Sequence, residues 1–117
     1  MARFCVLAIF LTVLMISFPA HADSNLGRKI FKGNKCDTCH YPDTVSLGPT
    51  LGKIAETYKG RRDRLVRFLN GQEKPIVFPE KFESVMEAFL GNTKLLTLEQ
   101  RKDLADYIMS HGKDSPR

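Results

Sequence analysis

The sequence predicts an all-α domain of about five short helices. In several stretches, apolar residues recur at the three- and four-residue spacing of amphipathic helices, and no stretch shows the alternation of a half-buried strand. Glycines also follow these stretches directly, at the position where glycine commonly ends a helix. These glycines are Gly33, Gly60, Gly71, Gly91 and Gly112.

The first 22 residues have the features of a secretory signal peptide. Arg3 supplies a positive charge, an almost unbroken apolar run covers residues 4–18, and Ala20-His21-Ala22 forms an A-x-A cleavage site. The run is short for a membrane span of about 20 residues, which argues against a retained anchor. Cys5 lies at the start of the run, which argues against lipoprotein processing. We expect cleavage after Ala22 and a periplasmic location.

Removal of residues 1–22 from the 117-residue chain leaves one domain of 95 residues, positions 23–117. A domain of this size buries a modest share of its surface and is often helped by a metal or a crosslink. Loss of Arg3 lowers the formal charge from +5 to +4, which suits an acidic docking partner or simply solubility. No basic motif is interleaved with aromatic residues, so we expect no nucleic-acid partner. Because cleavage removes the apolar run, we also expect that the mature chain is not an integral membrane protein.

We expect the first helix over residues 24–32, with Ser24 as its N-cap. Its apolar face consists of Leu26, Ile30 and Phe31. Gly27 lies inside this helix at a cost of about 1 kcal/mol relative to alanine. Either another helix approaches closely at Gly27, or the glycine is an ordinary tolerated one.

Cys36-Asp37-Thr38-Cys39-His40 follows this helix and has the form of a covalent attachment site for a c-type haem. Two thiols three residues apart can face one side of a helical turn, where they reach the two porphyrin vinyl groups and form thioethers. His40 is then held under the iron with a ring nitrogen free to coordinate it. The motif predicts one covalently bound haem c.

Two other interpretations of the Cys-x-x-Cys pair were weighed. A thioredoxin-like redox pair expects a βαβ pattern, and none is visible. Structural zinc needs four ligands in paired clusters. The other candidate ligands are Cys5, in the predicted signal segment, and the histidines His21 and His111.

The third and fourth helices each have one apolar stripe. The stripe of the third is Leu51, Ile54, Ala55 and Tyr58. The stripe of the fourth is Leu65, Phe68 and Leu69, opposite the basic face Arg61, Arg62, Arg64 and Arg67. Residues 71–79 are expected to form a loop. In it, Ile76-Val77-Phe78 is an apolar trio that we expect to be exposed and to close over the haem edge.

The next helix can open at Pro79, and its stripe contains Met86. The members of this stripe are Phe82, Val85, Met86, Phe89 and Leu90. Such a methionine is usually a core residue, but a histidine-ligated haem iron that only carries electrons favours a second protein ligand. The other methionine of the mature chain, Met109, is out of step with the stripe of its helix. We therefore expect Met86 to be the distal ligand, with His111 or an open site as alternatives.

The last helix is introduced by a capping box, Thr97-x-x-Gln100. Leu98, Leu104, Tyr107 and Ile108 follow at helical spacing. We expect His111 in its last turn and Gly112 as its stop. Tyr107 is the large flat side chain that can rest on Gly27 and Phe31.

The mature chain resembles the small class I monohaem cytochromes c of bacteria over essentially its whole length, and most closely those of the c-553/c-555 kind. The residues that carry the resemblance are Gly27, Phe31, Cys36-x-x-Cys39-His40, Gly48-Pro49, Met86 and Tyr107. In many members proline follows the ligand methionine in an irregular loop. Here Glu87 follows Met86 and the spacing is helical, which suggests an extra helix.

The resemblance implies the small cytochrome c fold, wrapped around one haem. Cys36 and Cys39 would be the thioether links, His40 the proximal ligand and Met86 the distal ligand. The carbonyl of Pro49 would accept a hydrogen bond from the other ring nitrogen of His40 and so fix the ring. The first and last helices would cross at Gly27, Phe31 and Tyr107.

We expect a soluble periplasmic one-electron Fe(II)/Fe(III) carrier between respiratory or chemolithotrophic redox complexes, and not an enzyme. Basic side chains would steer it onto acidic docking surfaces. Examples are Lys35, Lys53, Lys74 and Lys81. The alternatives are a haem-carrying subunit of a larger oxidoreductase and a haem enzyme or sensor with an open sixth site. No proton-transfer constellation stands beside the motif, which weighs against the enzyme.

Overall fold

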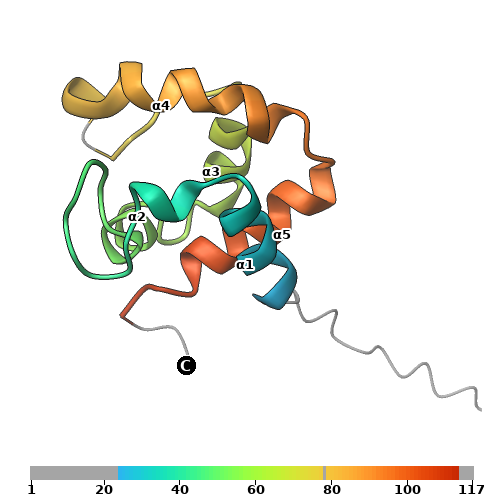
Figure 1. Ribbon diagram of the computed structural model, residues 1–117, viewed down its shortest axis with the longest axis horizontal. Coiled ribbons are helices and arrows are strands. Elements are labelled where there is room, and N and C mark those ends of the chain that lie inside the picture. Colours follow the sequence, from blue (N-terminus) through green and yellow to red (C-terminus); the bar gives the residue numbers. More distant parts are fainter. Residues whose placement is uncertain (1–23, 78, 114–117) are drawn as a thin grey trace, which may run out of the picture.

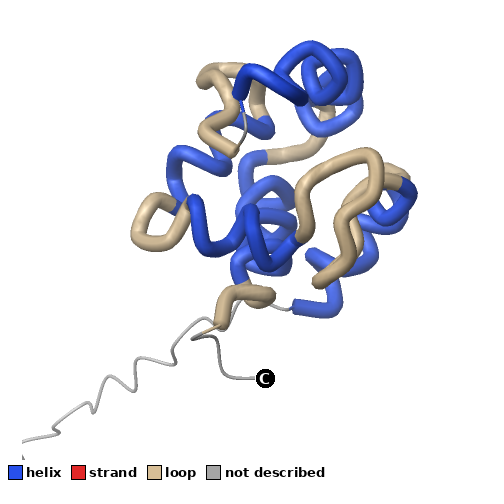
Figure 2. The backbone as a smooth tube through the Cα atoms, turned by 90° about the vertical axis from the view of Figure 1, so that its left-hand side faces the viewer, coloured by secondary structure: helices blue, strands red, loops and turns tan. Residues whose placement is uncertain are grey.

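The computed structural model describes residues 24–77 and 79–113, and within them every regular element is helical (Figure 1). The elements are α1 (Ser24–Gly33), the 3-10 turn η1 (Cys36–Thr38), α2 (Leu51–Thr57), α3 (Arg62–Leu69), α4 (Pro79–Lys94) and α5 (Leu98–Met109). Figure 2 shows these helices joined by loops, with no strand in the described part of the chain. The predicted all-α class is confirmed. The predicted signal peptide, residues 1–22, lies outside the described residues.

The helices α1 and α5 cross in close contact, and Gly27 makes this contact possible. A Cβ on Gly27 would meet the carbonyl oxygen of Asp103 and would stand 2.6 Å from the Cβ of Tyr107. One turn further along α1, the ring of Phe31 packs on that of Tyr107, with centroids 5.3 Å apart. The close approach predicted at Gly27 is therefore confirmed, and any larger side chain there would push the two helices apart.

Three helix ends follow the rules of local capping. Thr50 caps α2 by accepting a hydrogen bond from the backbone of Lys53 at 3.0 Å. The capping box at the start of α5 is present in both directions, at 3.1 Å and 2.9 Å. After α3, Gly71 has a φ of 70°. The N–H groups of residues 71 and 72 donate hydrogen bonds to the carbonyls of Phe68 and Arg67, respectively. These local patterns explain why the sequence alone located the helices.

Three helix ends differ from the predicted ones, two of them by only one or two residues. Gly33 is the last residue of α1, and Lys35, with a φ of 60°, makes the left-handed turn that follows. Gly91 lies inside α4, which continues to Lys94. There the Arg101 side chain of α5 donates hydrogen bonds to the carbonyls of Thr93 and Lys94. The helix α5 ends at Met109, two residues before His111, whose N–H donates to the carbonyl of Ile108. The side chain of Ser24, the predicted N-cap, lies outside the described part.

The core consists of apolar side chains from the described helices and the loop before α4. Its most buried members are Leu51, Ala55, Tyr58, Leu65, Leu104 and Ala105, followed by Phe31. Val77 is also buried and Ile76 is half-buried, so the expectation that this trio is exposed was wrong for both. Two contacts hold this loop against the body: the carboxylate of Glu73 pairs with Arg64 and Arg67 of α3, and the N–H of Ile76 donates to the hydroxyl of Tyr58. Phe78 lies outside the described residues.

Candidate haem site

The turn around η1 places three chemically distinctive side chains on the wall of one cavity. The N–H groups of Cys39 and His40 both donate to the carbonyl of Cys36, at 3.2 Å and 2.9 Å, which tightens the turn. Cys36, Cys39 and His40 all line the cavity, and the two cysteines are free thiols. Burial and, to a smaller degree, the neighbouring charge of Asp37 raise the pKa of Cys36 to about 11, so its thiol is protonated at neutral pH.

His40 is held in a fixed orientation by the loop before α2. Its side chain is buried, and Nδ1 lies 2.7 Å from the carbonyl oxygen of Pro49. Because a carbonyl can only accept, Nδ1 carries a proton, which leaves Nε2 as the ring nitrogen that can bind a metal. Gly48 lies against the ring, where a Cβ would stand 2.7 Å from Cε1, and its N–H donates to the carbonyl of Cys39. This loop therefore sets both the tautomer and the angle of the imidazole.

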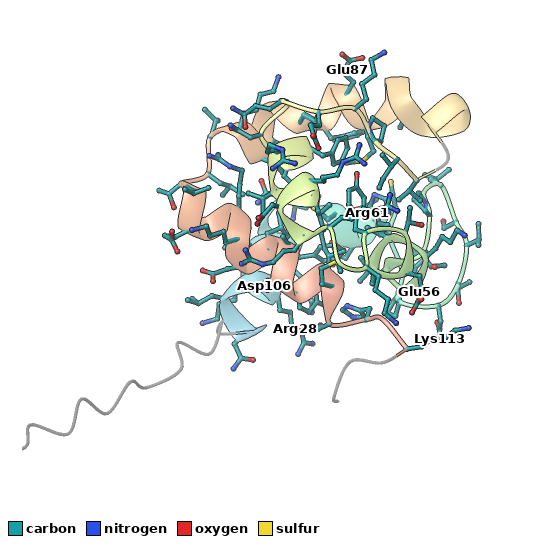
Figure 3. All side chains as sticks on the ribbon, turned by 180° about the vertical axis from the view of Figure 1, so that it is seen from behind. Arg28, Glu56, Arg61, Glu87, Asp106 and Lys113 are labelled. Carbon is teal, nitrogen blue, oxygen red and sulfur yellow. The ribbon has the colours of Figure 1, made fainter. Side chains whose placement is uncertain are left out.

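Met86 faces His40 from α4. Its sulfur lies 3.5 Å from Nε2 of His40, and the neighbouring side chains of Val85 and Phe89 line the same cavity. Glu87, the residue that stands where many relatives have proline, points away from the body of the molecule in Figure 3. The helical backbone expected around Met86 is confirmed, since residues 79–94 form the single helix α4.

His111, the alternative ligand, and Met109, the other methionine of the mature chain, both lie elsewhere. Neither Met109 nor His111 is among the residues that line the cavity. The ring of His111 instead stands edge-on against Tyr107, with centroids 4.9 Å apart, and its Nδ1 lies 3.0 Å from the carbonyl oxygen of Tyr107. In the described residues, no group of three or more His, Cys, Asp or Glu side chains could hold a metal ion.

The cavity has a volume of about 230 Å³, and all five α-helices contribute apolar side chains to it. They include Phe31, Leu51, Ile54, Leu65, Phe68, Leu69, Leu104 and Ile108. An apolar hollow suits a porphyrin, two thiols on one wall suit its vinyl groups, and facing nitrogen and thioether donors suit its iron. The residues present therefore fit a covalently bound haem.

Sequence reasoning missed one residue of this site, Thr93. It is buried on α4 and lines the cavity, and its hydroxyl donates a hydrogen bond of 2.6 Å to the carbonyl of Leu69. It was overlooked because α4 was expected to end at Gly91. A helix continued past that glycine would have placed Thr93 on the face of Met86, seven residues later.

The predicted basic ring is described in part. Lys35 lines the cavity and is exposed, and Lys53 and Lys74 are also exposed, whereas the side chain of Lys81 lies outside the described part. Among the described residues, no helix is long and apolar enough to cross a membrane.

Comparison with known protein families gives one match. The family model described as cytochrome c matches residues 24–112, which extend from the start of α1 to the turn after α5. A search of curated proteins finds no match to the chain.

Proposed function

Because the chain belongs to the cytochrome c family, whose members use haem c for electron transfer, we propose that it is a one-electron carrier with two filled axial positions. In this proposal Cys36 and Cys39 form the thioether bonds, His40 is the proximal ligand and Met86 is the distal ligand. The observation that carries it is the 3.5 Å approach of the Met86 sulfur to Nε2 of His40 inside an apolar cavity.

The bound haem would supply the Fe(II)/Fe(III) couple, and the protein would hold and tune it. Pro49 would keep the proton on Nδ1 of His40, so that the lone pair of Nε2 stays available to the iron. The thioether of Met86 and the apolar walls would favour the ferrous state and raise the reduction potential. If His40 and Met86 both held the iron, no position would remain for a substrate, which would favour a carrier over an enzyme.

We extend the proposal to the subtype, the location and the partners. The resemblance supports a small class I cytochrome of the c-553/c-555 kind, made of residues 23–117 after removal of the signal peptide 1–22 in the periplasm. The donor and acceptor would be respiratory or chemolithotrophic complexes with acidic docking surfaces. A haem-carrying subunit of a larger oxidoreductase is the alternative. Co-purification with one large partner would favour it.

Expression in a host that matures c-type cytochromes tests the haem chemistry. The intact mass should equal that of residues 23–117 plus one haem, and the reduced-minus-oxidised spectrum should be that of a c-type cytochrome. A colourless protein with the mass of the bare polypeptide would refute the proposal.

The distal ligand needs a separate test. The ferric protein should show the weak charge-transfer band at the red edge that is typical of a methionine ligand, and Met86→Ala should abolish it. Met109→Leu is the matched control and should keep the band, because Met109 does not line the cavity. Rapid binding of carbon monoxide by the reduced wild type would indicate an open site instead.

A further inference from the structure

Two residues in the C-terminal half of the helix that carries Met86 are buried, Leu90 and Thr93. The other residues described there and just before, 85, 87–89, 91, 92 and 94, are exposed, and Met86 is half-buried. Figure 1 shows α4 along the upper edge of the molecule with α3 beneath it. Met86 and Thr93 lie two turns and about 10 Å apart on the same face of the helix. A contact that holds Thr93 in place therefore also sets how far Met86 is rotated about the axis of α4 and where it lies along that axis.

The hydroxyl of Thr93 bonds to a carbonyl that α3 leaves open. Leu69 is the last residue of α3, so its carbonyl has no partner within that helix. The hydroxyl has one proton to donate. Its contact with the Leu69 carbonyl, at 2.6 Å, is much shorter than its 3.2 Å contact with the carbonyl of Leu90 in its own helix. The shorter contact links the two helices beside the cavity, which both residues line.

Arg101 of α5 closes the same end of α4. Its side chain is buried, and Nη1 donates to the carbonyls of Thr93 at 3.4 Å, Lys94 at 3.3 Å and Leu96. A positive guanidinium at the C-terminus of a helix also interacts favourably with the helix dipole. Its Nε is buried with no hydrogen-bond partner in the described part of the chain.

We propose that Thr93 is a positioning residue for Met86, with Arg101 holding the backbone at Thr93 from the other side. This inference rests on the proposed role of Met86 as distal ligand. Loss of the Thr93 hydroxyl would leave the buried Leu69 carbonyl unpaired and would free α4 to turn or slide on α3. The sulfur of Met86 would then compete less well with an external ligand.

Imidazole is the probe, titrated into the ferric holoprotein while the red-edge band is followed. In Thr93→Val, which keeps the shape and removes the hydroxyl, imidazole should replace Met86 at about tenfold lower concentration, as expected for loss of one buried hydrogen bond. Thr93→Ser should restore the wild-type titration. If Thr93→Val does not yield holoprotein, Arg101→Lys, which retains the charge but loses the fork, should show a shift in the same direction.

Asp106→Asn is the matched control, because it weakens the α3–α5 contact with Arg62 away from α4. It should lower the unfolding midpoint and leave the imidazole titration unchanged. An equal imidazole shift in Asp106→Asn, or a titration of Thr93→Val within twofold of wild type, would overturn the inference. Met86→Ala separates the two proposals: if it keeps the band, Met86 is not the ligand and the proposed function fails first.

Discussion

Gly48 packs against the imidazole of His40 so closely that a Cβ at position 48 would stand 2.7 Å from Cε1. This contact is tighter than any that real side chains tolerate, so only glycine lets the loop and the ring keep their positions. The same loop supplies the Pro49 carbonyl that holds Nδ1 at 2.7 Å. The orientation of the proposed proximal ligand is therefore set by two consecutive residues of one loop.

We predict that Gly48→Ala disturbs this arrangement. The added methyl group should push the ring of His40 away from the Pro49 carbonyl, which lowers the yield of holoprotein and shifts the reduction potential of what remains. Voltammetry and the haem-to-protein absorbance ratio measure both effects. Gly33→Ala is the control, because a Cβ at Gly33 meets nothing within 4 Å and should leave both quantities unchanged.

Gly91→Ala should stabilise the protein. Gly91 lies in the interior of α4, and a Cβ there meets nothing within 4 Å. Alanine is more favourable than glycine in a helix interior by about 1 kcal/mol. Chemical denaturation of the holoprotein should therefore show a gain of up to about 1 kcal/mol in the free energy of unfolding. A loss of stability would mean that α4 needs the glycine for a reason that the open space around it does not explain.

The carboxylate of Asp106 receives a two-pronged hydrogen bond from Arg62, one prong of which measures 2.7 Å. This hydrogen bond is the main reason that the pKa of Arg62 is raised, and its effect is larger than that of burial or of the surrounding charges. Arg62→Gln and Asp106→Asn should each destabilise the protein by about 1 kcal/mol, the usual size for a charge-assisted bond that is partly solvated. The double variant should cost no more than either single one. Additive losses in this cycle would show that the two side chains act independently.

Glu73→Gln should release the loop before α4. The carboxylate of Glu73 lies 3.3 Å from Nε of both Arg64 and Arg67, and this pairing draws residues 70–77 onto α3. Without the negative charge, the amides of Ile76 and Val77 should exchange hydrogen faster, which mass spectrometry can follow by peptide. Glu99→Gln removes an exposed carboxylate that pairs with Lys102 at 2.9 Å and should leave the exchange of this loop unaltered.

The helices could be predicted because their signals are local. The Thr97–Gln100 capping box and the stripe around Leu65 are confined to one helix each, and both appear in the structure. The role of the Cys36–His40 segment could also be predicted, because the haem-attachment motif depends only on the spacing of residues within five positions. Gly48 and Pro49 entered only through the resemblance to a family, because nothing in their own residue types indicates that they meet His40.

What could not be predicted depends on contacts between distant segments. Gly91 was expected to end α4 because glycine is a common stop signal. The helix continues past it, and Arg101, ten residues later, donates to a carbonyl at the end of α4, a contact that no local rule anticipates. The bond from Thr93 to Leu69 spans 24 residues and joins a side chain to a backbone atom, which leaves no trace in hydrophobic periodicity. The local sequence did not indicate that Ile76 and Val77 are buried, because their loop is held by ion pairs between Glu73 and two arginines of another helix.

The crossing of α1 and α5 at Gly27 has a consequence for the order of folding. In the described part of the chain α1 is the first helix and α5 the last, so the surface around Gly27 has no partner until these two distant segments meet. Contacts between segments so far apart in sequence are slow to form, because a long loop must close before they contribute. We therefore expect the crossing of α5 with α1, which immediately precedes the Cys36–Cys39 turn, to be among the last long-range contacts to form.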